Sequence, residues 1–219
     1  MRQRIWLIDG LRSGAILLMI LYHFLFDLQV FYQRPLGLWE FPWPEFRITV
    51  AASFIFLSGY SLTLSSRPVR HGLELLGFSI AVTGVSVWFN PFVIIIFGVL
   101  HLLGISYLLG AWVFSRLPYW VNFVLAALLL SMAGRTIGFP PVLLPLGDGG
   151  EYFPMMDYYP LIPWLSPFLF GVVAGQIGLF KKFVSTKESW LLLPGRYSIW
   201  IYLIHQPILL GALYLYYGR

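Results

Sequence analysis

The sequence predicts an all-α protein: a polytopic bundle of about seven membrane-spanning helices with its N-terminus in the cytoplasm. Of its residues, 59% are hydrophobic and only 11% are charged, against roughly 25% charged in an ordinary soluble domain. A spanning helix needs about 20 mostly apolar residues. The 219 residues are therefore predicted to form one transmembrane domain, residues 1–219. The chain has no cysteine, which excludes disulfides and thiolate chemistry.

Apolar runs separated by proline, glycine and charged clusters give the expected spans in order. These spans lie near residues 11–32, 46–65, 72–89, 92–114, 119–138, 160–180 and 195–217. The apolar segment near the N-terminus runs past Asp9, Arg12 and Asp27 with no small-residue cleavage site, so we expect a retained helix rather than a signal peptide. Only Asn90-Pro91 separates the third and fourth runs, so one longer, kinked helix is the alternative there.

The distribution of lysine and arginine sets the expected orientation. With seven spans and the N-terminus inside, the cytoplasmic side holds ten basic residues: Arg2, Arg4, Arg12, Arg67, Arg70, Arg116, Lys181, Lys182, Lys187 and Arg196. The other side holds four: Arg34, Arg47, Arg135 and Arg219. This is the positive-inside bias of cytoplasmic loops. The outer loops, 33–45 and 139–159, carry acidic and aromatic residues instead.

Ionisable residues inside a membrane span are costly and indicate a functional site. Arg12 and His23 are eleven residues apart in the first span, so they share a helix face and lie about 16 Å apart along the axis. Asp27 lies one turn beyond His23 and is placed to orient it, while Asp9 is spaced to pair with Arg12. The alternative for Arg12 is that its side chain only reaches the inner headgroups.

Three histidines are expected at one depth near the midplane. His101 and His205 each lie about ten residues into their spans, and His23 lies slightly outward. An imidazole exchanges protons near neutral pH, so these residues are candidate catalytic groups together with Asp27 and Arg12. The alternative is a structural role, in which each histidine hydrogen-bonds a neighbouring helix.

Two further groups of residues are candidates for binding. The cytoplasmic cations are candidates for the phosphates of a donor such as coenzyme A, or for anionic lipids: Arg12, Arg67, Arg70, Lys181, Lys182 and Arg196. Arg47, Asp157 and Trp164 are candidates for the acceptor on the outer side. Arg47 is alternatively an interfacial cation, and Asp157 alternatively shapes the outer loop. Neither metal-ligand spacing nor a glycine-rich phosphate loop is present, so no metal is expected.

Several segments resemble the bacterial relatives of heparan-α-glucosaminide N-acetyltransferase. They are LIDGLR at 7–12, AILLM at 15–19, YHFLFD at 22–27, FLSGY at 56–60, GVLH at 98–101, DYYPLIPW at 157–164 and YLIHQP at 202–207. The Arg12 to His23 spacing is also similar to the first-helix motif of the transmembrane acyltransferase superfamily. The sequence departs from that family at Ser13, where glycine is common. It also has no histidine between Phe24 and Arg70, where the lysosomal members place a catalytic histidine. The resemblance aligns His23 with an asparagine in the first helix of those members, and the catalytic role is transferred to His23 on this basis.

The resemblance implies an enzyme of the bacterial cytoplasmic membrane that moves an acyl group, typically acetyl from cytosolic acetyl-CoA, to an amine or hydroxyl acceptor such as a sugar. The expected partners are the acyl-CoA, the acceptor, membrane lipids and a second copy of the chain, with no nucleic acid. His23 would be the general base, although an acetyl-histidine intermediate is the alternative. A proton-coupled transporter is the rival function, because midplane histidines are equally typical of carriers, and a non-catalytic scaffold is the third.

Overall fold

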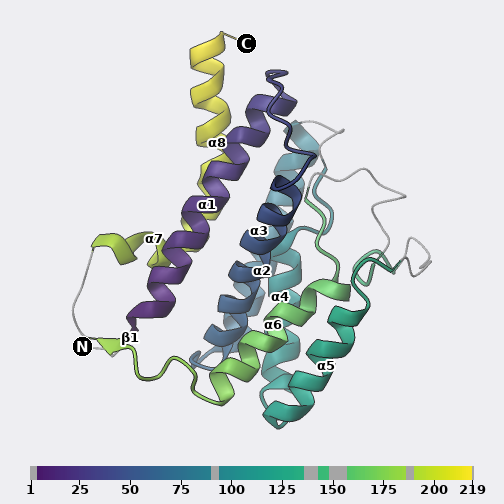
Figure 1. The fold of residues 1–219 in the computed structure, drawn as a ribbon, viewed down its shortest axis with the longest axis vertical. Helices are drawn as coiled ribbons and strands as arrows, with labels where there is room; N and C mark the ends of the chain where they lie inside the picture. The colour runs from purple at the N-terminus through teal and green to yellow at the C-terminus, as the bar shows by residue number, and fades with distance from the viewer. Residues whose placement is uncertain (1–3, 90–93, 136–142, 148–156, 186–189, 219) are drawn as a thin grey trace. The chain divides into compact units, whose positions relative to one another are not determined.

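The computed structural model describes residues 4–89, 94–135, 143–147, 157–185 and 190–218. Helices dominate this part of the chain (Figure 1). The α-helices are α1 (Trp6–Val30), α2 (Trp43–Leu62), α3 (Pro68–Phe89), α4 (Val99–Leu109), α5 (Tyr119–Ser131), α6 (Leu161–Gln176), α7 (Leu193–Arg196) and α8 (Ser198–Tyr217). A π-helical turn, η1 (Gly110–Phe114), extends α4, and a 3-10 turn, η3 (Trp190–Leu192), precedes α7. Two two-residue strands, β1 (Arg4–Ile5) and β2 (Val184–Ser185), pair antiparallel.

The chain separates into two compact units, residues 1–54 with 180–219 and residues 55–179. The first unit combines both ends of the sequence, and the second contains the middle. Helix α2 begins in the first unit and ends in the second. The prediction of one domain over residues 1–219 stays a prediction.

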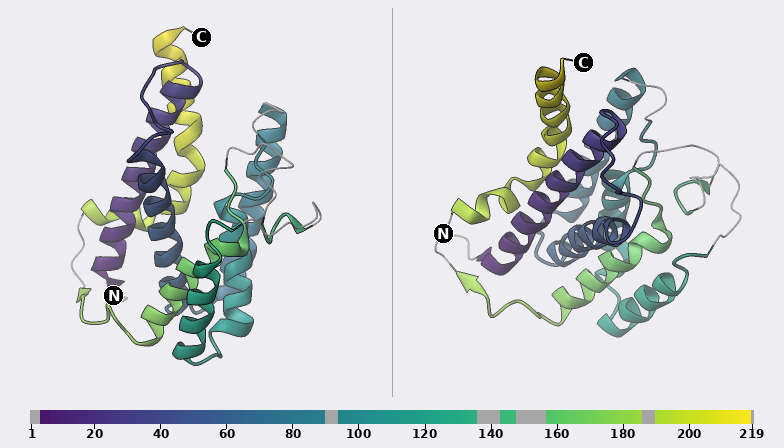
Figure 2. Two further views of the ribbon diagram at one scale, coloured as in Figure 1. Left: turned by 45° about the vertical axis from the view of Figure 1, so that its right-hand side comes forward. Right: turned by 45° about the horizontal axis from the view of Figure 1, so that its top comes forward.

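In the first unit, α1 packs along both α7 and α8 (Figures 1 and 2). The start of α1 is attached to the segment after α6, because the backbone N–H of Trp6 donates to the carbonyl of Phe183 at 3.1 Å and the two rings meet edge to face. Further along α1, the ring of Tyr22 packs against that of Phe46 at the start of α2. The first helix is therefore held by segments from both ends of the sequence.

In the second unit, glycines allow the C-terminal half of α2 to approach α6 closely. A Cβ added at Gly59 would overlap the backbone of Phe168, and one added at Gly171 would overlap the carbonyl oxygen of Phe56. Small residues permit this kind of backbone contact between membrane helices, where van der Waals packing is a main source of helix association. Gly59 and Gly171 are therefore the positions at which α2 and α6 come into backbone contact.

Replacing Gly171 with alanine is expected to lower the free energy of unfolding by about 1–3 kcal/mol, because the new methyl group must push α6 away from the α2 backbone. Thermal denaturation of the purified protein in detergent measures the change. Gly84→Ala in α3 is the matched control, since nothing lies within 4 Å of its added Cβ. Equal stability of the two variants would contradict the close approach.

Two amide side chains join α5 to α6 in the same unit. Asn122, which is fully buried, donates to the carbonyl of Phe114 at 2.9 Å and to the side-chain oxygen of Gln176 at 3.1 Å. Gln176 in turn donates to the carbonyl of Leu117 at 2.8 Å. These bonds satisfy carbonyls at the end of the α4 extension, where helical bonding stops. Helices α3 and α4 also pack side by side (Figure 2).

The all-helical prediction is confirmed. Within the residues that the structure describes, three helices are long and apolar enough to cross a membrane: Trp6–Val30, Pro68–Trp88 and Ser198–Tyr217. Three shorter apolar helices cover Val99–Phe114, Tyr119–Ser131 and Leu161–Gln176. Seven spans and a cytoplasmic N-terminus stay predictions. The third and fourth spans are separate helices, because residues 94–98 are not helical and Gly98 is extended, with φ −87° and ψ −176°. The expected start of the fourth span at residue 92 was therefore too early.

Candidate active site

Two of the predicted histidines meet in the first unit. His23 lies on α1 and His205 near the middle of α8, and their ring centroids are 4.9 Å apart with the planes at 82°. His205 is only 8% exposed, whereas His23 is half-buried. The structure thus brings together two imidazoles that are 182 positions apart in the sequence, and His23 is more exposed than His205.

The hydrogen bonds of these rings fix which nitrogen carries the proton. Nδ1 of His23 lies 2.9 Å from the carbonyl oxygen of Met19, and Nδ1 of His205 lies 2.6 Å from that of Tyr202. A carbonyl oxygen can only accept, so Nδ1 is the donor in both neutral rings and Nε2 keeps its lone pair. Nε2 of His205 is buried without a hydrogen-bond partner in the described part of the chain. Both rings therefore offer Nε2 as a base or nucleophile.

Asp27 forms its hydrogen bond with a residue that the sequence analysis did not select. The side-chain amide of Gln206 donates to Oδ1 of Asp27 at 2.7 Å, and Asp27 is fully buried. The expected direct orientation of His23 by Asp27 is thus wrong at the level of contacts, because the imidazole bonds to its own helix at Met19. Asp27 instead connects α1 to α8, one helical turn from the pair of rings.

Near the start of α1, charged groups gather beside α7. Oδ2 of Asp9 lies 3.8 Å from Nε of Arg196, and both side chains are largely buried. A Cβ added at Gly195 would overlap the carbonyl of Asp9 and lie 3.1 Å from Cβ of Arg12. Arg12 and Arg196 therefore lie on adjacent backbone segments, and only glycine fits between them.

Ser13 reinforces this contact. Its hydroxyl donates to the carbonyl of Asp9 at 3.0 Å and accepts the backbone N–H of Gly195 at 2.8 Å. Ser13 is buried, so it supplies partners to two backbone groups that water does not reach. The sequence analysis did not predict this bridging role of Ser13. The available signal was its position directly after Arg12, at the end of the segment that also holds Asp9.

Lys181 and Lys182 also belong to the first unit and are exposed. Nζ of Lys182 lies 5.2 Å from the ring centroid of Phe183, the residue whose carbonyl accepts the N–H of Trp6. The predicted cationic cluster is therefore divided. Arg12, Lys181, Lys182 and Arg196 lie in the first unit, and Arg67 and Arg70 lie in the second.

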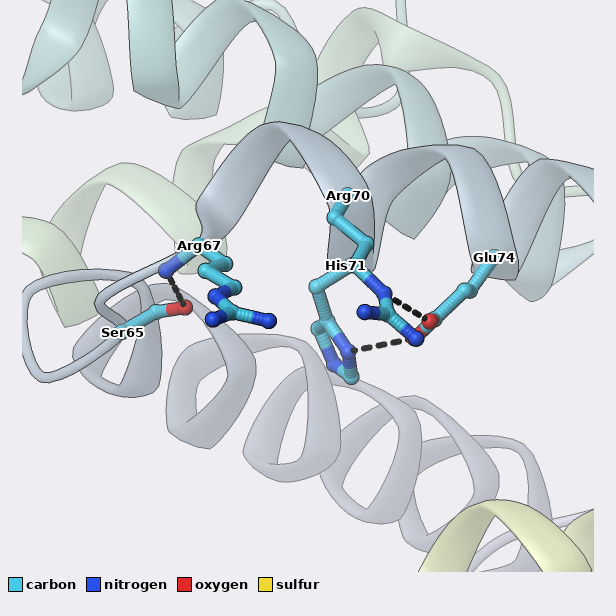
Figure 3. Close-up of polar contacts among 5 residues, drawn as sticks. All are labelled: Ser65, Arg67, Arg70, His71 and Glu74. Atoms are coloured by element: carbon cyan, nitrogen blue, oxygen red, sulfur yellow. Dashed lines mark hydrogen bonds and ion pairs between the residues drawn. The ribbon is translucent and has the colours of Figure 1, made fainter.

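Figure 3 shows the surroundings of the second group. Nε of Arg70 donates to Glu74 at 2.8 Å, and the ring of His71 lies 3.8 Å from the same carboxylate. The side chains of Arg70 and His71 are exposed, with relative accessibilities of 68% and 45%. Beside them, the backbone N–H of Arg67 donates to the hydroxyl of Ser65. Arg70 thus forms a local i,i+4 ion pair on an exposed helix surface, where such pairs contribute little to stability. Its phosphate-binding role stays a prediction.

His101 belongs to the second unit and has a different bonding pattern. It lies in the first turn of α4 rather than ten residues into a helix, because α4 begins at Val99. Its Nδ1 accepts the backbone N–H of Gly98 at 3.3 Å, and its Nε2 lies 3.4 Å from the hydroxyl of Thr83. That hydroxyl donates to the carbonyl of Ile95 at 2.6 Å, so Nε2 of His101 is the donor to Thr83.

The lone pair of His101 is therefore engaged in capping a helix, in contrast to the lone pairs of His23 and His205. The expected position of His101 about ten residues into its helix was wrong, because α4 begins at Val99 rather than at residue 92. Its expected shared depth with the other two histidines stays a prediction. Its participation with the other two histidines stays a prediction, since His101 lies in a separate unit.

The three acceptor candidates are dispersed. Asp157, in the second unit, accepts the backbone N–H of Val99 at 3.3 Å and so lies at the positive end of α4. Trp164 packs edge to face against Tyr159 near the start of α6. Arg47 is exposed on α2, in the first unit. The structure thus supports the loop-shaping alternative for Asp157, because its carboxylate is attached to the start of a helix.

No group of three or more His, Cys, Asp or Glu side chains that could hold a metal ion is found in residues 4–89, 94–135, 143–147, 157–185 and 190–218. In the first unit, the chemically reactive groups are therefore the two imidazoles and, about three helical turns away along α1, the cations beside α7. This arrangement suits proton transfer and anion binding.

In the described residues, three helices have the length and apolar composition of the spans of an integral membrane protein. The family model described as heparan-α-glucosaminide N-acetyltransferase, catalytic, matches residues 4–207. The chain therefore belongs to that family, as its sequence motifs predicted. Comparison with curated proteins finds no match, and comparison with solved structures finds none either.

Proposed function

We propose that the chain transfers an acetyl group from acetyl-CoA to an amine or hydroxyl acceptor, sugars included, at a bacterial cytoplasmic membrane. The acceptor nitrogen or oxygen attacks the thioester carbonyl carbon, the C–S bond breaks, and coenzyme A leaves as a thiolate. His23 takes the proton that the acceptor loses and returns it to the departing sulfur. Membership of the acetyltransferase family supports this reaction class.

The observation that carries the proposal is the His23–His205 pair. The two rings are 4.9 Å apart, and each has its Nε2 lone pair available because Nδ1 donates to a backbone carbonyl. His23 is the more exposed ring and so is the proposed base, whereas buried His205 is proposed to relay the proton or to stabilise the developing negative charge. An acetyl-histidine intermediate would need the same free Nε2.

The cations beside α7 are proposed to bind the phosphates of acetyl-CoA. Guanidinium groups match phosphate geometry, and Arg12 and Arg196 lie on adjacent segments. Arg12 is eleven residues before His23, about 16 Å along α1, so the pantetheine arm would run along this helix with its thioester at the imidazoles. Lys181 and Lys182 are further candidates, together with Arg67 and Arg70.

The proposal is tested with purified protein reconstituted in lipid vesicles. Calorimetry is expected to show binding of acetyl-CoA, and radiolabelled acetyl groups are expected to appear on glucosamine. N-acetylglucosamine is the matched control acceptor, because its amine is blocked while its hydroxyls remain. Acetylation of both sugars would indicate a hydroxyl acceptor. Absence of acetyl-CoA binding, combined with proton-coupled uptake of a solute, would instead support a transporter.

A further inference from the structure

Gln206, which is half-buried, forms one side-chain hydrogen bond that links two helices of the first unit. Its amide nitrogen donates to Oδ1 of Asp27 at 2.7 Å, across 179 positions of sequence. Asp27 is fully buried, and neither its Oδ2 nor Oε1 of Gln206 has a hydrogen-bond partner in the described residues. Each side chain therefore depends on this single bond, and removing one partner leaves the other buried and unpaired.

The position of this bond relates it to the imidazoles. Gln206 directly follows His205 on α8, and Asp27 follows His23 by four residues on α1. Residues four apart lie on the same helix face about one turn apart. The amide–carboxylate bond thus fixes the register of α8 against α1 next to the place where the two rings meet.

We propose that Gln206 is a positioning residue for acetyl transfer: through Asp27, it holds α8 in the register that places the ring of His205 beside that of His23. This inference rests on the proposed function. The edge-to-face contact of the two rings is by itself a weak interaction that does not fix the register of the helices. A small slide of α8 along α1 would displace the ring of His205 from that of His23, and a displacement of about 1 Å at reacting groups can cost about 100-fold in rate.

Gln206→Leu is expected to lower kcat by about 100-fold, with the KM for acetyl-CoA unchanged, because the donor-binding cations lie at the other end of α1. Gln176→Leu is the matched control. It removes a half-buried glutamine that also joins helices, through Asn122 and the carbonyl of Leu117, but in the second unit. The control is expected to lower the melting temperature and to leave kcat unchanged.

Two variants of Asp27 show whether its hydrogen bond to Gln206 or its negative charge is needed. Asp27→Asn retains an oxygen that accepts from Gln206, so it is expected to retain kcat within about tenfold, whereas Asp27→Leu is expected to behave like Gln206→Leu. In thermal denaturation, the double variant Asp27→Leu with Gln206→Leu is expected to be no less stable than either single variant, because no orphaned partner remains.

The outcomes distinguish this inference from the proposed function. A wild-type protein that transfers no acetyl group overturns the proposed function itself. In an active protein, the inference fails if Gln206→Leu retains wild-type kcat while its stability falls, since that is a purely structural role. It also fails if Asp27→Asn loses as much kcat as Asp27→Leu, because the charge would then be what matters.

Discussion

Replacement of His23 or of His205 with phenylalanine is expected to lower kcat for acetyl transfer by about 10²–10⁴-fold, the contribution of a positioned acid–base group. Phenylalanine fills the space of the imidazole but has no nitrogen, so the loss measures the chemistry of Nε2 rather than packing. The two rings are 4.9 Å apart and are proposed to act on one proton. The double variant is therefore expected to be little worse than the poorer single variant.

His71→Phe is the control for this experiment. It also deletes an imidazole, but one that lies in the second unit, beside Glu74 and the ring of Tyr107. Its kcat is expected to equal that of the wild type. Turnover by isotope-labelled acetyl transfer, measured at saturating acetyl-CoA, gives the comparison. Full activity of both His23→Phe and His205→Phe would exclude the histidine pair as the reactive site.

Arg12→Gln is expected to raise the KM for acetyl-CoA by about 10–100-fold with a smaller change in kcat, because a charge-assisted hydrogen bond contributes about 1.5–3 kcal/mol. The effect on KM rather than on kcat follows from the position of Arg12, about 16 Å along α1 from His23. The proposed contact is with phosphates that do not change during the reaction. Initial rates at varied acetyl-CoA concentration separate the two constants.

Arg34→Gln is the matched control, since it removes the same charge beyond the opposite end of α1, where the guanidinium lies 5.4 Å from the ring centroid of Tyr217. Its KM is expected to be that of the wild type. If Arg12→Gln left the KM unchanged while Arg70→Gln raised it, the donor phosphates would belong to the second unit instead. Such a result would correct the proposed donor path without affecting the histidine pair.

Much of the helical architecture was predictable because apolar runs of about 20 residues are a strong local signal. The first and last long helices agree with that expectation: α1 covers Trp6–Val30 and α8 covers Ser198–Tyr217. The start of α4 was not predictable in this way, because residues 94–98 are as apolar as a helix and yet are not helical. Hydropathy alone does not distinguish the two conformations, and the error displaced His101 from the first turn of α4 to the middle of a span.

The candidate site was predictable only in part. The spacing of His23 and Asp27 on one helix face follows from the helical repeat, and so did not need the tertiary structure. Gln206 gave little signal, because a single glutamine in an apolar helix is an ordinary occurrence. Its partner lies 179 positions away, so only the packing of α8 on α1 reveals the bond.

The sequence by itself determined that this is a membrane protein of apolar helices and that Arg12, His23 and Asp27 share one face of the first helix, because both properties depend on local composition and a fixed helical repeat. Only the tertiary structure decided that His205 is the histidine beside His23, that Gln206 is the partner of Asp27, and that His101 caps α4. Those contacts depend on how helices pack and where they begin, which no local pattern specifies.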